Sequence, residues 1–169
     1  MLGSSTAWLT PVAVVVLLGV SAFFSSAEIA LFSSTATAET DDADRRSTTL
    51  ARLREDPHRL LVTILVGNNV VNVAIASVVS VAFAEQFSGG IAVTAATLAT
   101  SVLVLVFGEI VPKAYGLGRA NDWALTVAGP VAAVEFLLSP IVTVFDVVTR
   151  QLSAPLGGEQ GIERPYEDD

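Results

Sequence analysis

Cysteine is absent from the 169-residue chain, and histidine occurs once, at His58. The lack of cysteine excludes a disulfide framework and any thiolate site, and a single imidazole argues against a zinc or copper centre. Charged residues make up only 15% of the chain, whereas 52% of it is hydrophobic. A soluble domain of this length needs no such apolar share. The composition therefore predicts a membrane protein, surrounded by a lipid bilayer and not bound to nucleic acid.

Three long apolar runs account for this excess of hydrophobic residues. A helix needs roughly 20 apolar residues to cross a hydrocarbon core, and the runs at 8–32, 60–84 and 91–111 reach that length. We therefore predict three spanning helices, of which the last two are joined by a tight turn at 85–90.

Basic residues are missing from the N-terminal segment and from the 85–90 turn. All nine follow the first run, follow the third run or lie near the C-terminus: Arg45, Arg46, Arg52, Arg54, Arg59, Lys113, Arg119, Arg150 and Arg164. By the positive-inside rule, the N-terminus and the 85–90 turn face outward, and the 35–59 loop and everything after residue 111 are cytoplasmic. We expect a multi-pass plasma-membrane protein in this orientation.

Two further segments predict helices at the inner surface. Leu50 and Leu53 have the spacing of a short amphipathic helix, after which Asp56 and Pro57 have the pattern of an N-cap and first residue of the second span. The 121–152 segment is apolar but is interrupted by prolines and carries carboxylates, so a fourth span would expose these to lipid. We predict two or three short interfacial helices there instead.

The predicted fold class is an all-α membrane protein. It has three transmembrane helices plus short juxtamembrane helices that form a belt on the cytoplasmic side. We expect this membrane domain to cover residues 1–152, and 153–169 to form an acidic, flexible linker toward cytosolic domains absent from this chain.

Each apolar run also contains a polar cluster. In the first, Ser21, Ser25 and Glu28 follow the i, i+4, i+7 spacing of one helix face, and Ser26 is adjacent. The alternative is that these serines bond back to carbonyls of their own helix.

The second run contains Gly67, Asn68, Asn69 and Asn72, of which Asn68 and Asn72 share a helix face. Three asparagines within five residues exceed what packing needs, although interhelical hydrogen bonding is the alternative role.

The third run ends in Gly108 and Glu109, with Pro112 following. Pro112 has no N–H, so it cannot donate to the carbonyl of Gly108, and the helix must loosen beside the carboxylate. The alternative is that Glu109 pairs with Lys113 at the inner interface.

The three clusters fall at similar depths in the inner half of the membrane under the predicted topology. They offer hydroxyl, amide, carboxylate and carbonyl oxygens, which are ligands for a hard cation such as Mg²⁺, Ca²⁺ or Na⁺. A single carboxylate leaves a divalent ion incompletely neutralised, which favours the releasable binding of a transporter.

The segments 24–33, 65–72 and 107–113 together resemble the transmembrane domain of the CNNM/CorC family. The resemblance covers roughly 12–152. It implies Mg²⁺ transport, usually efflux driven by Na⁺, a homodimer, three spanning helices with a juxtamembrane belt, and a cytosolic CBS-pair domain beyond this chain.

Carried over from the family, the ion site consists of the Ser21 and Ser25 hydroxyls, the Gly67 carbonyl, Asn68 and Glu109, with the Gly108 carbonyl. Further candidates are Ser26, Asn69 and Asn72. The alternative function is a membrane anchor or dimerisation module for cytosolic regulatory domains. An enzyme is not expected, because no His–Ser, Asp–Asp or HExxH-like pair lies within the spans.

Overall fold

The computed structural model describes residues 8–36 and 45–153, and within these ranges every regular element is a helix. In chain order they are α1 (Leu9–Ser33), α2 (Arg45–Arg54), α3 (Pro57–Ala84), α4 (Gly89–Leu103), the π-helix η1 (Val104–Ile110), α5 (Val111–Gly118) and α6 (Ala120–Ser153). The predicted linker at 153–169 falls almost entirely outside the described residues.

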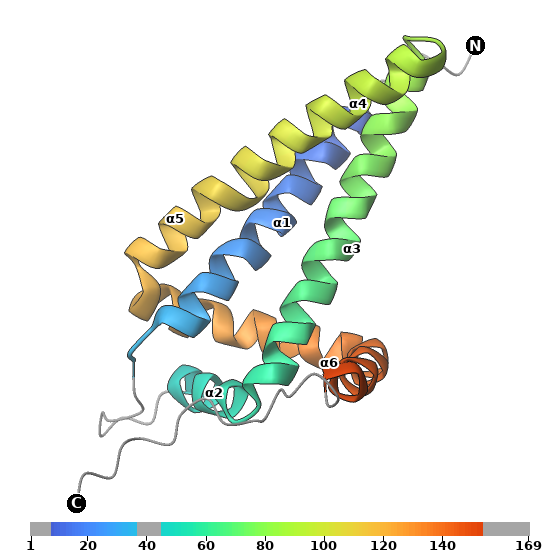
Figure 1. Ribbon diagram of the computed structural model, residues 1–169. Helices are drawn as coiled ribbons and strands as arrows, with labels where there is room; N and C mark the ends of the chain where they lie inside the picture. The colour runs from blue at the N-terminus through green and yellow to red at the C-terminus, as the bar shows by residue number, and fades with distance from the viewer. Residues whose placement is uncertain (1–7, 37–44, 154–169) are drawn as a thin grey trace, which may run out of the picture.

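Four stretches are long and apolar enough to cross a membrane: α1, α3, the continuous α4–η1–α5 rod, and most of α6. The predicted all-α membrane class is therefore confirmed. In Figure 1, α1, α3 and the rod lie side by side, whereas α6 lies across their lower ends next to α2. One helix thus differs in direction from the other three.

The prediction of two or three short helices in the 121–152 segment is wrong, because α6 is one helix of 34 residues. Pro130 and Pro140 lie inside it. Each proline removes one backbone hydrogen bond and bends a helix without necessarily ending it. In the half of α6 around Pro130, packing holds the helix together, since Val127 and Val131 are almost fully buried in the core.

The helix ends follow local sequence signals. The side chain of Asp56 accepts a hydrogen bond from the Arg59 amide at 3.0 Å, and Pro57 opens α3, as predicted. The turn between α3 and α4 occupies 85–88, and α4 begins at Gly89 with a φ of +59°. Glycine adopts this left-handed conformation without the steric cost that other residues meet.

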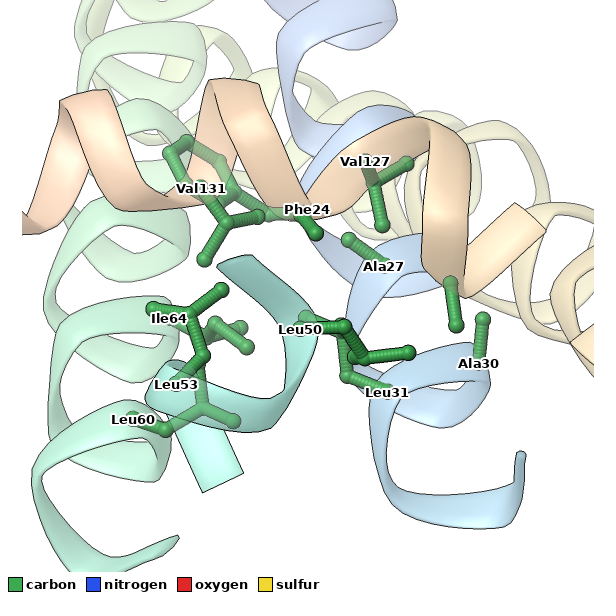
Figure 2. Close-up of a cluster of buried hydrophobic side chains, with 12 residues drawn as sticks. Phe24, Ala27, Ala30, Leu31, Leu50, Leu53, Leu60, Ile64, Val127 and Val131 are labelled. Carbon is green, nitrogen blue, oxygen red and sulfur yellow. The ribbon is translucent and has the colours of Figure 1, made fainter. Parts of the chain in front are cut away.

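An apolar cluster joins four helices at the end where α6 crosses. Figure 2 shows its labelled members: Phe24, Ala27, Ala30 and Leu31 of α1, Leu50 and Leu53 of α2, Leu60 and Ile64 of α3, and Val127 and Val131 of α6. The predicted amphipathic helix containing Leu50 and Leu53 is confirmed as α2. We call this group the belt cluster, and it fixes the second half of α1 in place.

Arg54 ties the end of α1 to α2. Its guanidinium donates to the carbonyls of Leu31, Ser34 and Ala36 at 2.7–3.2 Å. Leu31 is in the last turn of α1, whose carbonyls a helix C-terminus leaves without partners, and Ser34 and Ala36 directly follow the helix. Burial lowers the pKa of Arg54, but an arginine remains charged at neutral pH. Asn121 adds a second tie from α6, because its Oδ1 accepts from the Ser34 hydroxyl at 3.0 Å.

Candidate cation site

The hydroxyl of Ser21 on α1 contacts two side-chain amide oxygens of α3. Its Oγ lies 3.1 Å from Asn68 Oδ1 and 2.8 Å from Asn72 Oδ1, and its side chain is fully buried. The predicted common face of Asn68 and Asn72 is therefore confirmed. A hydroxyl has one proton, so it can donate to one of these oxygens at a time. The Ser21 hydroxyl oxygen and the two amide oxygens therefore lie together with a single hydroxyl proton among them. Their remaining lone pairs suit the coordination of a cation.

Gly108 brings the third spanning helix against the same serine. A Cβ at Gly108 would lie 2.8 Å from Ser21 Oγ, so only a glycine lets η1 approach this closely. The predicted loosening of the helix before Pro112 is confirmed, because residues Val104–Ile110 form a π-helix. Such π-segments occur frequently at functional sites. Residues of α1, α3 and η1 therefore meet at Ser21.

Gly67 makes room for an aromatic ring. A Cβ there would lie 2.6 Å from the Phe24 ring, which packs directly against the α3 backbone at this point. This contact accounts for the glycine by packing alone. The proposed ligand role of its carbonyl stays a prediction.

Ser25 lies one turn after Ser21 and is also fully buried. Its hydroxyl has no hydrogen-bond partner among the described residues. Most buried polar side-chain atoms have a partner, so an isolated hydroxyl needs an explanation. A ligand bound by Ser25 would explain why its hydroxyl is isolated.

Glu109 follows Gly108 and is partly buried. Within the described part of the chain it forms neither an ion pair nor a hydrogen bond. Lys113, which the alternative assignment paired with Glu109, instead contacts Glu28 with an Nζ–Oε2 distance of 3.2 Å. The carboxylate of Glu109 is thus not engaged by the neighbouring lysine.

The family model described as the cyclin M transmembrane N-terminal domain matches residues 12–168. The chain belongs to the CNNM family. The resemblance in the three polar motifs is thereby confirmed at the level of the family.

Several curated proteins are similar to this CNNM chain over most of its length. A chloroplastic DUF21 domain-containing protein of Arabidopsis thaliana is 35% identical over 153 residues, covering 89% of this chain and 23% of its own length. The UPF0053 inner membrane protein YfjD of Escherichia coli K12 is 29% identical over 114 residues, covering 68% and 26%. A UPF0053 protein of Synechocystis is 30% identical over 138 residues, covering 80% and 39%. The chain therefore spans well under half the length of these relatives.

Two candidate residues of the CNNM domain bond back to their own helices. Ser26 donates to the carbonyl of Phe23 at 3.1 Å, and exposed Asn69 donates to that of Leu65 at 2.9 Å. For Ser26 this is the alternative given above for the serines, whereas Asn69 bonds to its own helix and not across to another helix, the alternative given for the asparagines. Asn69 follows Asn68 directly, and one residue turns a helix by about 100°, so the two amides face different surroundings.

A cavity of about 450 Å³ begins at Asn72 and runs between α3 and the α4–η1 segment. It is lined by Asn72, Ala76, Ser80, Ala96, Thr97, Thr100, Ser101, Val104 and Leu105. Thr97 and Ser101 of α4 line this cavity and are exposed. Within the chain, α4 instead packs through the smaller side chains of Ala92 and Ala96. Thr100, missed in the sequence, has a buried hydroxyl without a partner among the described residues.

Proposed function

We propose that this CNNM domain transports Mg²⁺ through an intramembrane site made of oxygen ligands. The proposed ligands are the side chains of Ser21, Ser25, Asn68 and Glu109 and the carbonyls of Gly67 and Gly108, with Asn72 as a hydrogen-bonded neighbour. The observation that carries the proposal is the meeting of the Ser21 hydroxyl with two amide oxygens, one turn from the unpartnered hydroxyl of Ser25.

The chemistry of these groups favours a hard cation that is released again. Hydroxyl, amide and carboxylate oxygens suit Mg²⁺ better than softer metals, and Mg²⁺ commonly keeps part of its water shell beside one or two carboxylates. Among the described residues, no three His, Cys, Asp or Glu side chains gather into a metal-binding group. Glu109 as a lone carboxylate therefore fits a transported ion. Efflux driven by Na⁺ is the direction that the family resemblance favours.

The direction of α6 supports three spanning helices with a cytoplasmic belt. It lies across the ends of α1, α3 and the rod in Figure 1. Its Glu135 pairs with Arg59 at the start of α3 at 2.8 Å. The distribution of basic residues supports an orientation with this end in the cytoplasm and the N-terminus outside the plasma membrane.

A homodimer and a cytosolic CBS-pair domain complete the proposal. The relatives are much longer than this chain, which leaves room for further domains. The exposed hydroxyl-bearing face of α4 offers small side chains of the kind that let membrane helices approach one another. Thr97 and Ser101 are part of this face.

A membrane anchor is the second candidate function. The hydrogen bonds from Ser21 to Asn68 and Asn72 favour it, because such bonds also hold membrane helices together without any ion. The anchor role does not need a partly buried carboxylate at Glu109, and this residue separates the two functions.

Glu109→Gln in the full-length protein tests the proposal. The variant keeps the shape of the side chain and removes its charge. It should fold and insert, yet lose Mg²⁺ flux into dye-loaded liposomes and lose thermal stabilisation by Mg²⁺. Glu85→Gln is the matched control, because it removes the same charge at the exposed outer turn and should leave both signals intact. Normal flux by Glu109→Gln would favour the anchor function instead.

A further inference from the structure

Lys113, the only lysine of the chain, contacts one carboxylate and follows a second by four residues. Its Nζ is 3.2 Å from Glu28 Oε2 on the neighbouring helix. Glu109 precedes it by four residues, the spacing at which a glutamate and a lysine meet on one helix. The ammonium therefore has one partner across the α1–α5 interface and a second available on its own helix.

The backbone around Lys113 is held while its side chain is free to turn. A Cβ at Gly116 would clash with the carbonyl oxygen of Ser26, so α5 is in tight contact with α1 just beyond Lys113. Pro112, on the other side, is buried. The lysine side chain itself is 43% exposed and has a flexible four-carbon stem. A change of partner therefore requires only side-chain rotation.

Three arginines near the belt contact other groups, and Arg119 stacks over the Tyr115 ring. Arg52 and Arg59 contact Glu135, and Arg54 donates to the carbonyls that end α1. Lys113 is thus the basic residue positioned to act on Glu109.

We propose that Lys113 is a tethered counter-ion that alternates between Glu28 and Glu109. This inference rests on the proposed cation site. While Mg²⁺ is bound at Glu109, its charge repels the ammonium, and Glu28 holds it. When Mg²⁺ leaves, Lys113 turns to Glu109 and neutralises a carboxylate that is costly to leave unpaired inside a membrane. Lys113 therefore competes with Mg²⁺ for Glu109, which weakens Mg²⁺ binding and favours its release. Glu28 has the opposite effect, because it binds the Lys113 ammonium and keeps it from Glu109.

The alternation predicts opposite effects from the two halves of one ion pair. Lys113→Met removes the competitor and should tighten Mg²⁺ binding. Glu28→Gln removes the alternative partner, drives Lys113 to Glu109 and should weaken binding. Each change should alter Kd about threefold, since a partly exposed ion pair is worth roughly 0.6 kcal/mol. The double variant should bind as tightly as Lys113→Met, because without the ammonium Glu28 has nothing to hold.

The experiment is a Mg²⁺ titration of the thermal midpoint of the full-length protein in lipid nanodiscs. Lys113→Arg, which keeps the charge, should stay near the wild-type Kd. Arg119→Met, which removes a positive charge further along the chain, should do the same. Should Lys113→Met not fold, Lys113→Gln carries the same prediction.

Two results overturn the inference in distinguishable ways. If Lys113→Met and Glu28→Gln shift Kd in the same direction or not at all, while Glu109→Gln abolishes binding, the pair is structural and only the alternation fails. If Glu109→Gln binds Mg²⁺ normally, the proposed cation site fails and the alternation fails with it.

Discussion

The two faces of α1 bury side chains of opposite character. One face carries Phe24, Ala27 and Leu31 into the belt cluster, where apolar side chains from four helices pack together. The other carries Ser21 and Ser25, which are just as deeply buried but polar.

The polar groups beside these two faces differ as well. Next to the belt cluster, Arg54 and Asn121 provide partners for the end of α1. On the serine face, oxygens outnumber the protons between them, one hydroxyl has no partner among the described residues, and the adjoining helix is a π-helix. The belt cluster therefore stabilises α1 through its apolar face, while the opposite face carries the serines of the proposed cation site.

The largest expected effect is a loss of stability from a substitution in the belt cluster, the apolar side of this comparison. Leu50→Ala removes a side chain that is 2% exposed and should lower the free energy of unfolding by about 2–5 kcal/mol. Chemical denaturation in mild detergent measures this change. The Kd for Mg²⁺ of the fraction that stays folded should be unaffected, and a weakened Kd would show that the two faces are not separable.

A smaller loss of stability is expected at the α1–α5 contact. Gly116→Ala forces a methyl group against the carbonyl of Ser26 and should destabilise the protein by about 1–3 kcal/mol through overpacking. Gly118→Ala is the control, because no atom lies within 4 Å of a Cβ there. Equal thermal midpoints for both variants would contradict the tight contact between α1 and α5.

Ser25→Ala tests the polar side of the comparison. The change removes a hydroxyl that has no partner in the described part of the chain, so the thermal midpoint without Mg²⁺ should stay the same or rise. Mg²⁺ binding should weaken on the order of tenfold, roughly 1.4 kcal/mol. Ser26→Ala serves as the neighbouring control, because that hydroxyl bonds back to its own helix. The assignment of Ser25 as a ligand is wrong if both variants bind Mg²⁺ alike.

The smallest expected effect is at Asn69, and it tests how far the proposed cation site extends around α3. Asn69 is exposed and bonds to its own helix, so Asn69→Ala should change stability by less than about 0.5 kcal/mol and leave flux intact. Asn68→Ala should abolish the Mg²⁺-dependent signals, because Asn68 contacts Ser21. Loss of flux in Asn69→Ala would mean that the site extends to the other side of α3.

Local signals in the sequence predicted much of this arrangement. The cap at Asp56, the loosened helix before Pro112 and the shared face of Asn68 and Asn72 all follow from short-range geometry. The predictions that were wrong or left open concerned features that depend on long-range packing. The prolines of α6 predicted separate helices, but burial of Val127 and Val131 holds one helix through Pro130. The spacing of Glu109 and Lys113 left their pairing open, and Glu28 provides the observed partner from another helix.

The central claim is that side chains from three helices bind one Mg²⁺ ion, and a high-resolution experimental structure of the full-length protein with Mg²⁺ tests it most directly. The account predicts a cation in contact with Ser25, Asn68 and Glu109, with metal–oxygen distances of about 2.0–2.2 Å. Distances of about 2.3–2.6 Å would indicate Ca²⁺ instead. A density map in which these three side chains face lipid or separate cavities would contradict the cation site itself.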